Sequence, residues 1–453
     1  MNRNIRLDLE EQLLERLKGR LRLLQGDQER EEAVLSALEA VLLTDKSRKF
    51  SGELTLPDDK ARFVRRFLSY GVIEEFLCDN DVEDIVIHGL NPICLHHAQK
   101  GFIQTDRRFD HIRELDLFIR KLVIFGGRHD IRKVMDLELT NLGGRANIIY
   151  SPFGPQVTIT KAKSDPISII DLIERQSLTY EVAAQLWVYV EGFSVRPANI
   201  MIAGGPGTGK TTLLNALLSF IPEKEHLVVM EDTLELNTFL LDAVSRLESD
   251  DDLSLADLVK NSLRMRPERI IVGEVRGIEA RDMITAMNVG KYCLCTIHAL
   301  TSREAIIRLQ NEPMNIPEML VNLIDVFVVL RRFHVGDKLF RMVDEVSETG
   351  GMEQQKILLA PVYKYNYDQN KIVLMSPSTV YRDRLARETG RSPRDIINET
   401  LVRALVLKQI HKKGIHTVAD VTAFCRGYRE DPDKAMERIG LDRQALLKQA
   451  ERL

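Results

Sequence analysis

The chain has 453 residues, of which 44% are hydrophobic and 29% charged, and its formal net charge is −4. This length predicts about three domains with large cores, and the negative charge disfavours a generally basic surface for nucleic acid. No apolar run reaches the ~20 residues of a membrane span and no secretory signal opens the chain, so we expect a cytoplasmic protein without direct membrane insertion.

In chain order, the sequence predicts four regions. Residues 1–60 show helical periodicity with mixed charge and then a linker; these helices either pack on the next domain or form a partner-binding arm. Residues 61–165 mix helix and strand and predict an α+β domain. Residues 166–345 alternate short β-branched strands with helices, which is typical of an α/β, RecA-like core. Residues 346–453 begin as a hairpin and end as helices.

The five cysteines are scattered along these regions without a second close pair. Zinc sites and disulfide frameworks need paired spacings, so we expect the cysteines to be small buried apolar residues.

A phosphate-binding loop is the most specific motif, because the segment from Gly204 to Thr211 fits G-x-x-x-x-G-K-[ST]. It lies between a strand-like run, 198–203, and a helix-like run to Phe220. Glycines let backbone N–H groups turn toward an anion, Lys210 can reach the β- and γ-phosphates, and the Thr211 hydroxyl can ligate Mg²⁺. The expected nucleotide-binding residues here are Gly204, Gly205, Pro206, Gly207, Thr208, Gly209, Lys210, Thr211 and Thr212.

Acidic residues end two later strands of the same predicted core. Glu231 and Asp232 close one strand, and Glu274 follows Gly273, which stands where the usual Walker B strand ends in Asp. Carboxyl ends of parallel strands meet at the ligand edge of an α/β sheet. We expect Glu274 to polarise the attacking water, and the expected Mg²⁺ ligands are Thr211, Glu231, Asp232 and Glu274. The alternative for each carboxylate is a helix cap or an exposed loop acid.

His298 ends the next predicted strand, where either a γ-phosphate sensor or a structural histidine fits. Arginines offset charge on a transferred phosphoryl group, often across a subunit boundary. At least one of the nearby arginines should instead form a surface ion pair with Glu248 or Glu268. These arginines are Arg246, Arg264, Arg266 and Arg276.

The order of these motifs resembles the type II/IV secretion and type IV pilus-assembly ATPases, most closely the CpaF-like branch of VirB-type traffic ATPases and its archaeal relatives. The resemblance covers about residues 60–350, and residues 67–89 resemble the start of the family's N-terminal domain. The phosphate loop, acidic box, glutamate box and histidine box correspond to residues 204–211, 231–236, 264–277 and 295–299.

The resemblance implies a homo-hexameric ATPase that binds ATP and Mg²⁺ between its N-terminal and RecA-like domains. It further implies a motor for filament assembly of the pilus or archaellum type, or for protein secretion, which acts on an inner-membrane platform protein and so lies peripherally at the inner face of the membrane. Arg145 resembles an arginine of the N-terminal domain that faces nucleotide. The catalytic residues expected from the motifs and the resemblance together are Glu274, Glu231, His298, Arg246 and Arg276.

Three positions depart from the family pattern. Thr160 stands where the family's T-I-R-K has an arginine, Lys291 replaces a second histidine, and Cys293 replaces a glycine. We expect nucleotide geometry or coupling to differ from typical members at these positions.

Two other functions fit a RecA-like ATP site. A nucleic-acid translocase would show salt-sensitive, DNA-stimulated ATPase activity, but the acidic net charge and the lack of an aromatic-basic stretch disfavour it. A nucleotide-gated scaffold with little turnover is the other alternative, and Glu274→Gln distinguishes it from a motor. A GTPase would need an N-K-x-D motif and an ABC-type ATPase an L-S-G-G-Q signature, and both are absent from the sequence.

Overall fold

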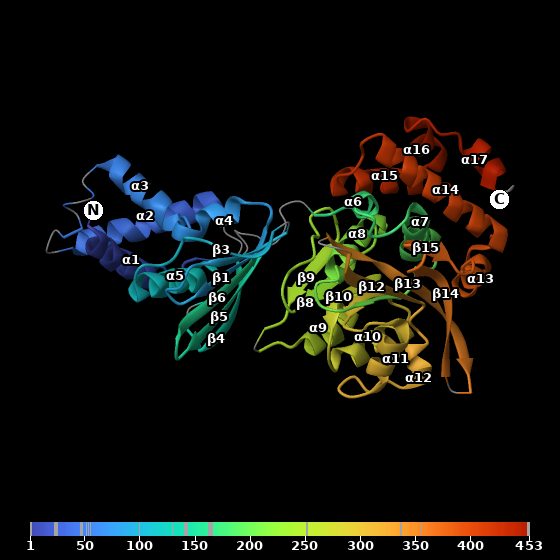
Figure 1. Cartoon of the computed structure of the whole chain (residues 1–453), viewed down its shortest axis with the longest axis horizontal. Coiled ribbons are helices and arrows are strands. Elements are labelled where there is room, and N and C mark those ends of the chain that lie inside the picture. The colour runs from blue at the N-terminus through green and yellow to red at the C-terminus, as the bar shows by residue number, and fades with distance from the viewer. Residues whose placement is uncertain are drawn as a thin grey trace. The chain divides into compact units, whose positions relative to one another are not determined.

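The chain divides into two compact units, Met1–Asp165 and Pro166–Leu453 (Figure 1). The structure, a computed structural model, describes residues 2–450 except 22–25, 46–48, 51, 53, 55, 99, 129, 140–143, 162–165, 251, 336–337 and 355. The boundary between the units falls just before the segment that leads into the phosphate-loop strand.

In the first unit, helices pack on an antiparallel sheet with the order β3-β2-β1-β6-β5-β4. The strands are β1 Val82–His88, β2 Cys94–His97, β3 Gly101–Gln104, β4 Val134–Leu139, β5 Gly144–Ser151 and β6 Gly154–Lys161. The helices are α1 Arg3–Leu17, α2 Asp27–Thr44, α3 Pro57–Leu68, α4 Glu74–Cys78 and α5 Ile112–Phe125, with the 3₁₀ turn η1 Gly71–Ile73.

Residues 1–60 share one hydrophobic core with the α+β part of this unit. Leu9 and Leu13 of α1 are fully buried in the same cluster as Leu122 of α5 and Ile85 of β1. Burial of leucine side chains removes apolar area from water, which stabilises the contact. Of the two alternatives for this region, the structure therefore shows helices that pack on the neighbouring domain.

The second unit is built on a sheet with the order β15-β14-β13-β12-β7-β11-β10-β8-β9. The strands from β12 to β9 run parallel, and β12 to β15 form antiparallel pairs. The strands are β7 Ile200–Gly204, β8 Leu227–Glu231, β9 Val244–Glu248, β10 Arg269–Val275, β11 Tyr292–Ile297, β12 Val326–Val335, β13 Lys338–Glu353, β14 Lys356–Asn366 and β15 Lys371–Leu374. This α/β arrangement is the predicted RecA-like core.

Helices cover both faces of this sheet (Figure 1). The α-helices are α6 Ile169–Glu174, α7 Tyr180–Glu191, α8 Lys210–Leu217, α9 Leu255–Ser262, α10 Glu279–Asn288, α11 Ser302–Gln310, α12 Glu318–Val321, α13 Val380–Thr389, α14 Pro393–Lys412, α15 Val418–Glu430, α16 Pro432–Arg438 and α17 Arg443–Ala450. Short 3₁₀ turns are η3 Gly192–Ser194, η4 Leu218–Phe220 and η5 Leu263–Met265. The helix predicted to run to Phe220 is confirmed as α8 followed by η4.

Successive residues of β12 face opposite cores, as the pleat of a strand requires. Val328 and Leu330 lie in the core that also contains residues of α8, whereas Phe327 and Val329 lie in the core with α9 to α11. The central strands are thus buried on both faces, which explains their continuous apolar sequence.

The C-terminal helices belong to the same unit as the phosphate loop. Arg403 of α14 is buried and donates to Glu191 of α7 at 3.0 Å and to Glu399 at 3.2 Å. Its guanidinium also lies 4.6 Å from the ring centroid of Trp187. This charged and aromatic cluster joins α14 to the core helices.

Cysteine burial is confirmed at four positions and wrong at one. Cys94, Cys293, Cys295 and Cys425 are buried, but Cys78 at the end of α4 is exposed, because the residues of α4 are not fully buried. Burial raises the pKa of Cys293 to about 12, so this thiol is a packing group at neutral pH.

None of the described helices is both long and apolar enough to cross a membrane.

Candidate nucleotide site

The predicted phosphate loop joins the end of β7 to the start of α8. Gly207 and Gly209 have φ of 66° and 94°, a left-handed backbone that favours glycine. A Cβ at Gly204 would lie 2.4 Å from Oγ1 of Thr208, which donates to the Gly205 carbonyl at 2.9 Å. The loop therefore needs glycine for both its backbone angles and its internal packing.

Lys210 and the two threonines occupy the first turn of α8, where the helix dipole favours an anion. The Lys210 ammonium donates to the Gly205 carbonyl at 3.2 Å and lies 3.4 Å from Nδ1 of His298. Burial lowers the pKa of Lys210, although the Glu274 carboxylate opposes that shift. Thr211 and Thr212 are half-buried beside it, with their hydroxyls on the first helical turn.

Glu274, His298 and Arg276 form one hydrogen-bonded group at the carboxyl ends of β10 and β11. Oε1 of Glu274 lies 2.9 Å from Nε2 of His298, and Arg276 donates to both Glu274 oxygens at 2.7 and 3.1 Å. Burial opposes ionisation of Glu274, but the Arg276 hydrogen bonds and the surrounding positive charges outweigh it, so its pKa lies below the usual value. The group is a carboxylate at neutral pH.

Burial and the Lys210 charge lower the pKa of His298, which favours the neutral imidazole. A neutral ring with its proton on Nε2 donates to Glu274 and accepts from Lys210 at Nδ1, so one tautomer satisfies both contacts. The structure brings the predicted histidine into direct contact with the predicted catalytic glutamate.

Glu231, at the end of β8, faces its own loop rather than open space. Its Oε1 accepts the N–H groups of Glu235 and Leu236 at 2.9 and 2.8 Å, and Oε2 lies 3.4 Å from Nη2 of Arg246. Burial raises its pKa, although these partners oppose the shift. Asp232 is exposed and accepts the Ser249 hydroxyl at 2.7 Å.

Gly273, at the usual Walker B position, lies against the Glu231 side chain, which leaves little room for a side chain there. A Cβ at Gly273 would lie 3.0 Å from Cγ of Glu231, tighter than most contacts. Glu231 thus fills the space that an aspartate side chain would need, which links the atypical Gly273 to the buried carboxylate on the next strand.

Two of the arginines form ion pairs with acids at strand ends. Arg246 pairs with Glu231 and Arg276 with Glu274, whereas the Glu268 carboxylate accepts the backbone N–H of His226 at 2.6 Å. The expected pair with Glu248 or Glu268 stays a prediction, because the ion pairs described for Arg246 and Arg276 are with other acids at strand ends. Arg264 and Arg266 are exposed, with no carboxylate partner among the described residues.

The structure shows where two of the departures from the family pattern, Thr160 and Lys291, lie. Thr160 on β6 donates its hydroxyl to Asp84 on β1 at 2.7 Å and stands opposite Arg145 of β5 in the first unit. Lys291 precedes β11, whereas His298 follows it, so the two residues lie at opposite ends of one strand. Lys291 is therefore separated by the length of β11, about 20 Å, from the edge of the sheet at which the phosphate loop lies.

Sequence reasoning missed three residues at this site. Glu279 in the first turn of α10 accepts the N–H of Gly277 at 2.6 Å and that of Arg276, which fixes the turn after Glu274. Arg341 donates to the Gly207 carbonyl at 2.9 Å, and Arg332 lies beside the same glycine. An acid at the start of a helix was a visible signal for Glu279, but no local pattern marks the two arginines.

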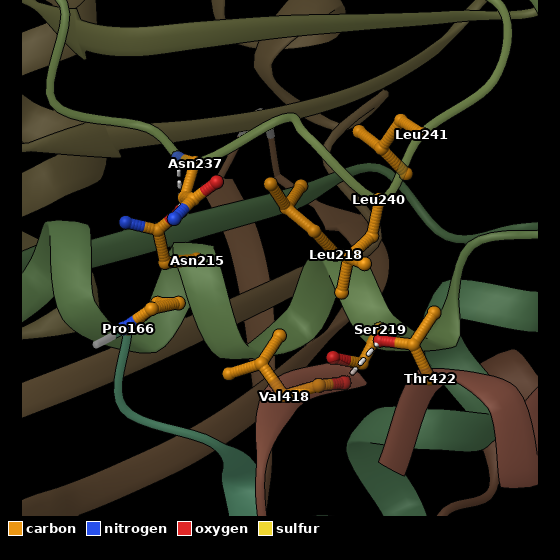
Figure 2. Close-up of a pocket in the computed structure, with 9 residues that line it drawn as sticks. All are labelled: Pro166, Asn215, Leu218, Ser219, Asn237, Leu240, Leu241, Val418 and Thr422. Atoms are coloured by element: carbon orange, nitrogen blue, oxygen red, sulfur yellow. Dashed lines mark hydrogen bonds between the residues drawn. The ribbon is translucent and has the colours of Figure 1, made fainter. Parts of the chain in front are cut away.

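A small pocket at the far end of α8 contains no ionisable side chain (Figure 2). Ser219, on η4, is buried there without a hydrogen-bond partner among the described residues, close to α15. The lining residues are Pro166, Asn215, Leu218, Ser219, Asn237, Leu240, Leu241, Val418 and Thr422. The lining has two hydroxyls but no charged side chain or general base to activate them, so we assign no chemistry to this pocket.

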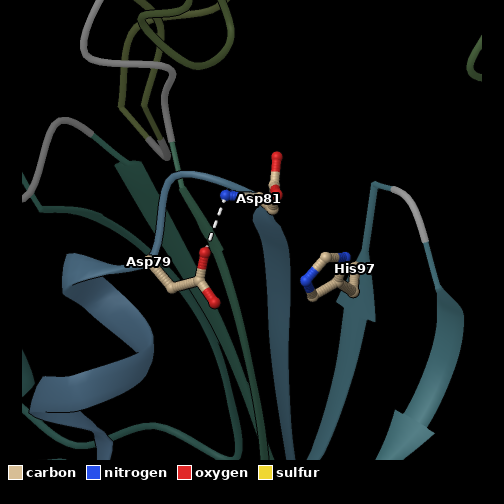
Figure 3. A group of neighbouring side chains, drawn as sticks. All are labelled: Asp79, Asp81 and His97. Atoms are coloured by element: carbon tan, nitrogen blue, oxygen red, sulfur yellow. Dashed lines mark hydrogen bonds between the residues drawn. The ribbon is translucent and has the colours of Figure 1, made fainter.

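In the first unit, Asp79, Asp81 and His97 lie close enough together to hold a metal ion (Figure 3). The Asp79 carboxylate accepts the Asp81 N–H at 2.9 Å, and Nδ1 of His97 accepts the Lys100 N–H at 3.4 Å. These bonds shape the turns beside β1 and β2, so the grouping has a structural explanation without an ion.

Comparison with known proteins identifies the family. The model of the family described as "Type II/IV secretion system protein" matches residues 137–443. An uncharacterised protein of Methanocaldococcus jannaschii is 32% identical over 375 residues, which are 78% of this chain and 67% of the relative. The conjugal transfer protein TrbB of Rhizobium radiobacter is 32% identical over 225 residues, 47% of this chain and 68% of the relative.

Among solved structures, the pilus retraction motor PilT with bound ADP is 18% identical, covers 85% of this chain and 100% of its own, and has a TM-score of 0.46. Because that TM-score is low, membership rests on the family match and on the archaeal relative. The chain belongs to the type II/IV secretion system protein family, and within it the chain has a phosphate-loop sequence on a RecA-like core.

Proposed function

We propose that this protein is an ATPase, and that it works as a hexameric motor that powers assembly of a pilus- or archaellum-type filament, or protein secretion, by acting on a platform protein in the membrane. The observation that carries the proposal is the contact of Glu274 with His298 beside Lys210, which couples the hydrolytic carboxylate to the phosphate loop. A site of this kind senses whether the γ-phosphate is present, as a cycling motor requires.

In the proposed reaction, the phosphate loop and Lys210 hold the β- and γ-phosphates, and Glu274 orients the attacking water. Glu274 has its hydrogen bonds to Arg276 and His298 in this structure. Its low pKa suits an orienting and polarising role more than storage of a proton. Arg276 pairs with Glu274 in this structure. We propose that, during hydrolysis, its guanidinium leaves this carboxylate and offsets the negative charge that develops on the γ-phosphate.

Magnesium fits the donor set of this site. The Thr211 hydroxyl and the Asp232 carboxylate are hard oxygen ligands, the class that Mg²⁺ prefers. The Glu274 carboxylate is of the same class, but it would have to leave Arg276 and His298 to bind the ion. Glu231 was also an expected ligand, but its oxygens already accept two backbone N–H groups and face Arg246, so we propose that it shapes the acidic loop. When bound, Mg²⁺ would offset phosphate charge.

The proposed partners are five further copies of the chain and a membrane platform protein. Arg145, on β5 of the first unit, is proposed to face nucleotide as its family counterpart implies, and Arg246 to help offset charge near the acidic strand ends. We propose that the protein stays peripheral to the membrane through its partners.

Oligomeric state and partner are tested with the full-length protein. Light scattering with a non-hydrolysable ATP analogue should report a mass about six times the 51.8 kDa of one chain. Glu274→Gln should co-purify a polytopic membrane protein encoded beside prepilin genes. A monomer at all nucleotide concentrations, or ATPase activity stimulated by DNA and lost at high salt, would contradict the motor.

A further inference from the structure

The β12–β13 hairpin extends past the end of β7 and reaches the phosphate loop. Leu330 pairs with Gly204, the last residue of β7, so the residues that follow Leu330 stand beside the loop. Arg332 continues the face of Val328 and Leu330, the face covered by α8. Arg341 is its cross-strand partner and therefore shares that face.

Both guanidinium groups contact the loop at one residue. Nε of Arg341 donates to the Gly207 carbonyl at 2.9 Å. Nη1 of Arg332 lies 2.9 Å from the point where a Cβ on Gly207 would stand. Both side chains are exposed, and neither has a carboxylate partner among the described residues. Two adjacent positive charges without a carboxylate partner among the described residues attract an anion.

Arg331 provides the contrast on the opposite face of the same hairpin. It pairs with Asp344 at 3.0 Å and lies 5.6 Å from the centroid of the Tyr367 ring. Of the two consecutive arginines, Arg331 is therefore paired with a carboxylate, whereas Arg332, which faces the phosphate loop, has no carboxylate partner among the described residues.

The strand order indicates which part of a nucleotide the hairpin meets. The strands that carry Glu274 and precede His298, β10 and β11, lie on one side of β7, and β12 lies on the other. A γ-phosphate directed at Glu274 therefore leaves the α-phosphate nearer the hairpin.

We propose that Arg332 binds the α-phosphate of the nucleotide and that Arg341 is a positioning residue that holds the outer side of the phosphate loop through Gly207. The inference rests on the proposed nucleotide binding and is independent of the motor proposal. A guanidinium suits this role, because it stays charged and its fork of donors matches phosphate oxygens.

The test is calorimetric titration of full-length protein with ADP and with inorganic tripolyphosphate. Arg332→Ala should weaken both by about tenfold, the loss of one charge-assisted contact, and Arg332→Lys should recover part of it. Arg331→Ala is the matched control and should leave both affinities unchanged. Melting temperatures confirm that each variant folds.

Unchanged ADP affinity in Arg332→Ala would overturn the proposal. A loss for ADP but not for tripolyphosphate would also overturn it, because the arginine would then contact the base or ribose. For Arg341→Ala we expect a KM for ATP raised severalfold with kcat within about twofold. An unchanged KM would remove the positioning role of Arg341.

Discussion

Nε2 of His298 lies 2.9 Å from Oε1 of Glu274, and Nδ1 of the same ring lies 3.4 Å from the Lys210 ammonium. One imidazole thus connects the lysine that we propose holds the γ-phosphate with the glutamate that we propose orients water. A bound phosphate would compete for Lys210, and the change would reach Glu274 through a single ring.

Glu274→Gln should keep nucleotide binding and lose hydrolysis by at least about 10²-fold, because an amide is a poor acceptor for a water proton. The measurement is kcat for phosphate release beside the Kd for ADP. Glu223→Gln is the control, since Glu223 precedes β8 at the opposite end of a strand and pairs with Arg426. Equal hydrolysis by Glu274→Gln and wild type would remove the catalytic role and favour a nucleotide-gated scaffold.

The activity of the enzyme should fall in acid through His298. Burial and Lys210 place the pKa of His298 below the usual 6.5. The ring is therefore neutral at neutral pH, and kcat should not vary with pH there. As pH falls through the lowered pKa, Nδ1 gains a proton facing Lys210, and the contact becomes repulsive. The acid limb of kcat against pH should disappear in His298→Gln at reduced rate. It should persist in His226→Gln, whose ring contacts Ser245 at the other end of the sheet.

Gly273→Ala should destabilise the second unit by about 1–3 kcal/mol, because its Cβ would press on Glu231. Urea unfolding of Gly273→Ala, Glu231→Ala and the double variant measures the coupling, which should be favourable by about 1 kcal/mol. Gly350→Ala is the matched strand control, with an ordinary 3.5 Å contact to Leu358. If the changes in unfolding free energy of the two single variants add up to that of the double variant, a Cβ at position 273 does not compete with the Glu231 side chain for space.

Arg403→Met should destabilise the second unit by about 3–5 kcal/mol, because the buried Glu191 and Glu399 carboxylates would lose their partner. The measurement is denaturant unfolding followed by Trp187 fluorescence. Lys408→Met, exposed on the same helix, should change stability by less than about 0.5 kcal/mol. If both variants unfold alike, the ion cluster does not hold α14 in place.

The stability from this cluster should depend on pH in the direction set by Glu399. Burial opposes its ionisation, but the charges of Arg403 and Arg443 outweigh burial and lower its pKa below the usual 4.5. The contribution of Glu399 to the free energy of unfolding is fully present above its pKa in the unfolded chain. It is lost as the pH falls through its lower pKa in the folded protein. The Arg403→Met variant should lose this dependence.

Much of the site was predictable because its parts are local or lie at strand ends. The phosphate loop is eight consecutive residues whose glycines and lysine carry their own geometry, and Glu274 and His298 end neighbouring parallel strands. Short, continuous β-branched runs with helical segments between them were enough to predict the α/β core. The roles of Arg246 and Arg276 could not be derived this way, because their nearest acids depend on how loops close.

The sequence by itself determined the phosphate-binding chemistry, the α/β class and the order of the acidic and histidine motifs, since each follows from residues near one another in the chain. Only the tertiary structure decided that Glu231 turns to its own backbone, that Gly273 makes room for it, and that Arg341 meets Gly207, 134 residues away. Such contacts arise from strand order and register, which set distances that no stretch of sequence contains.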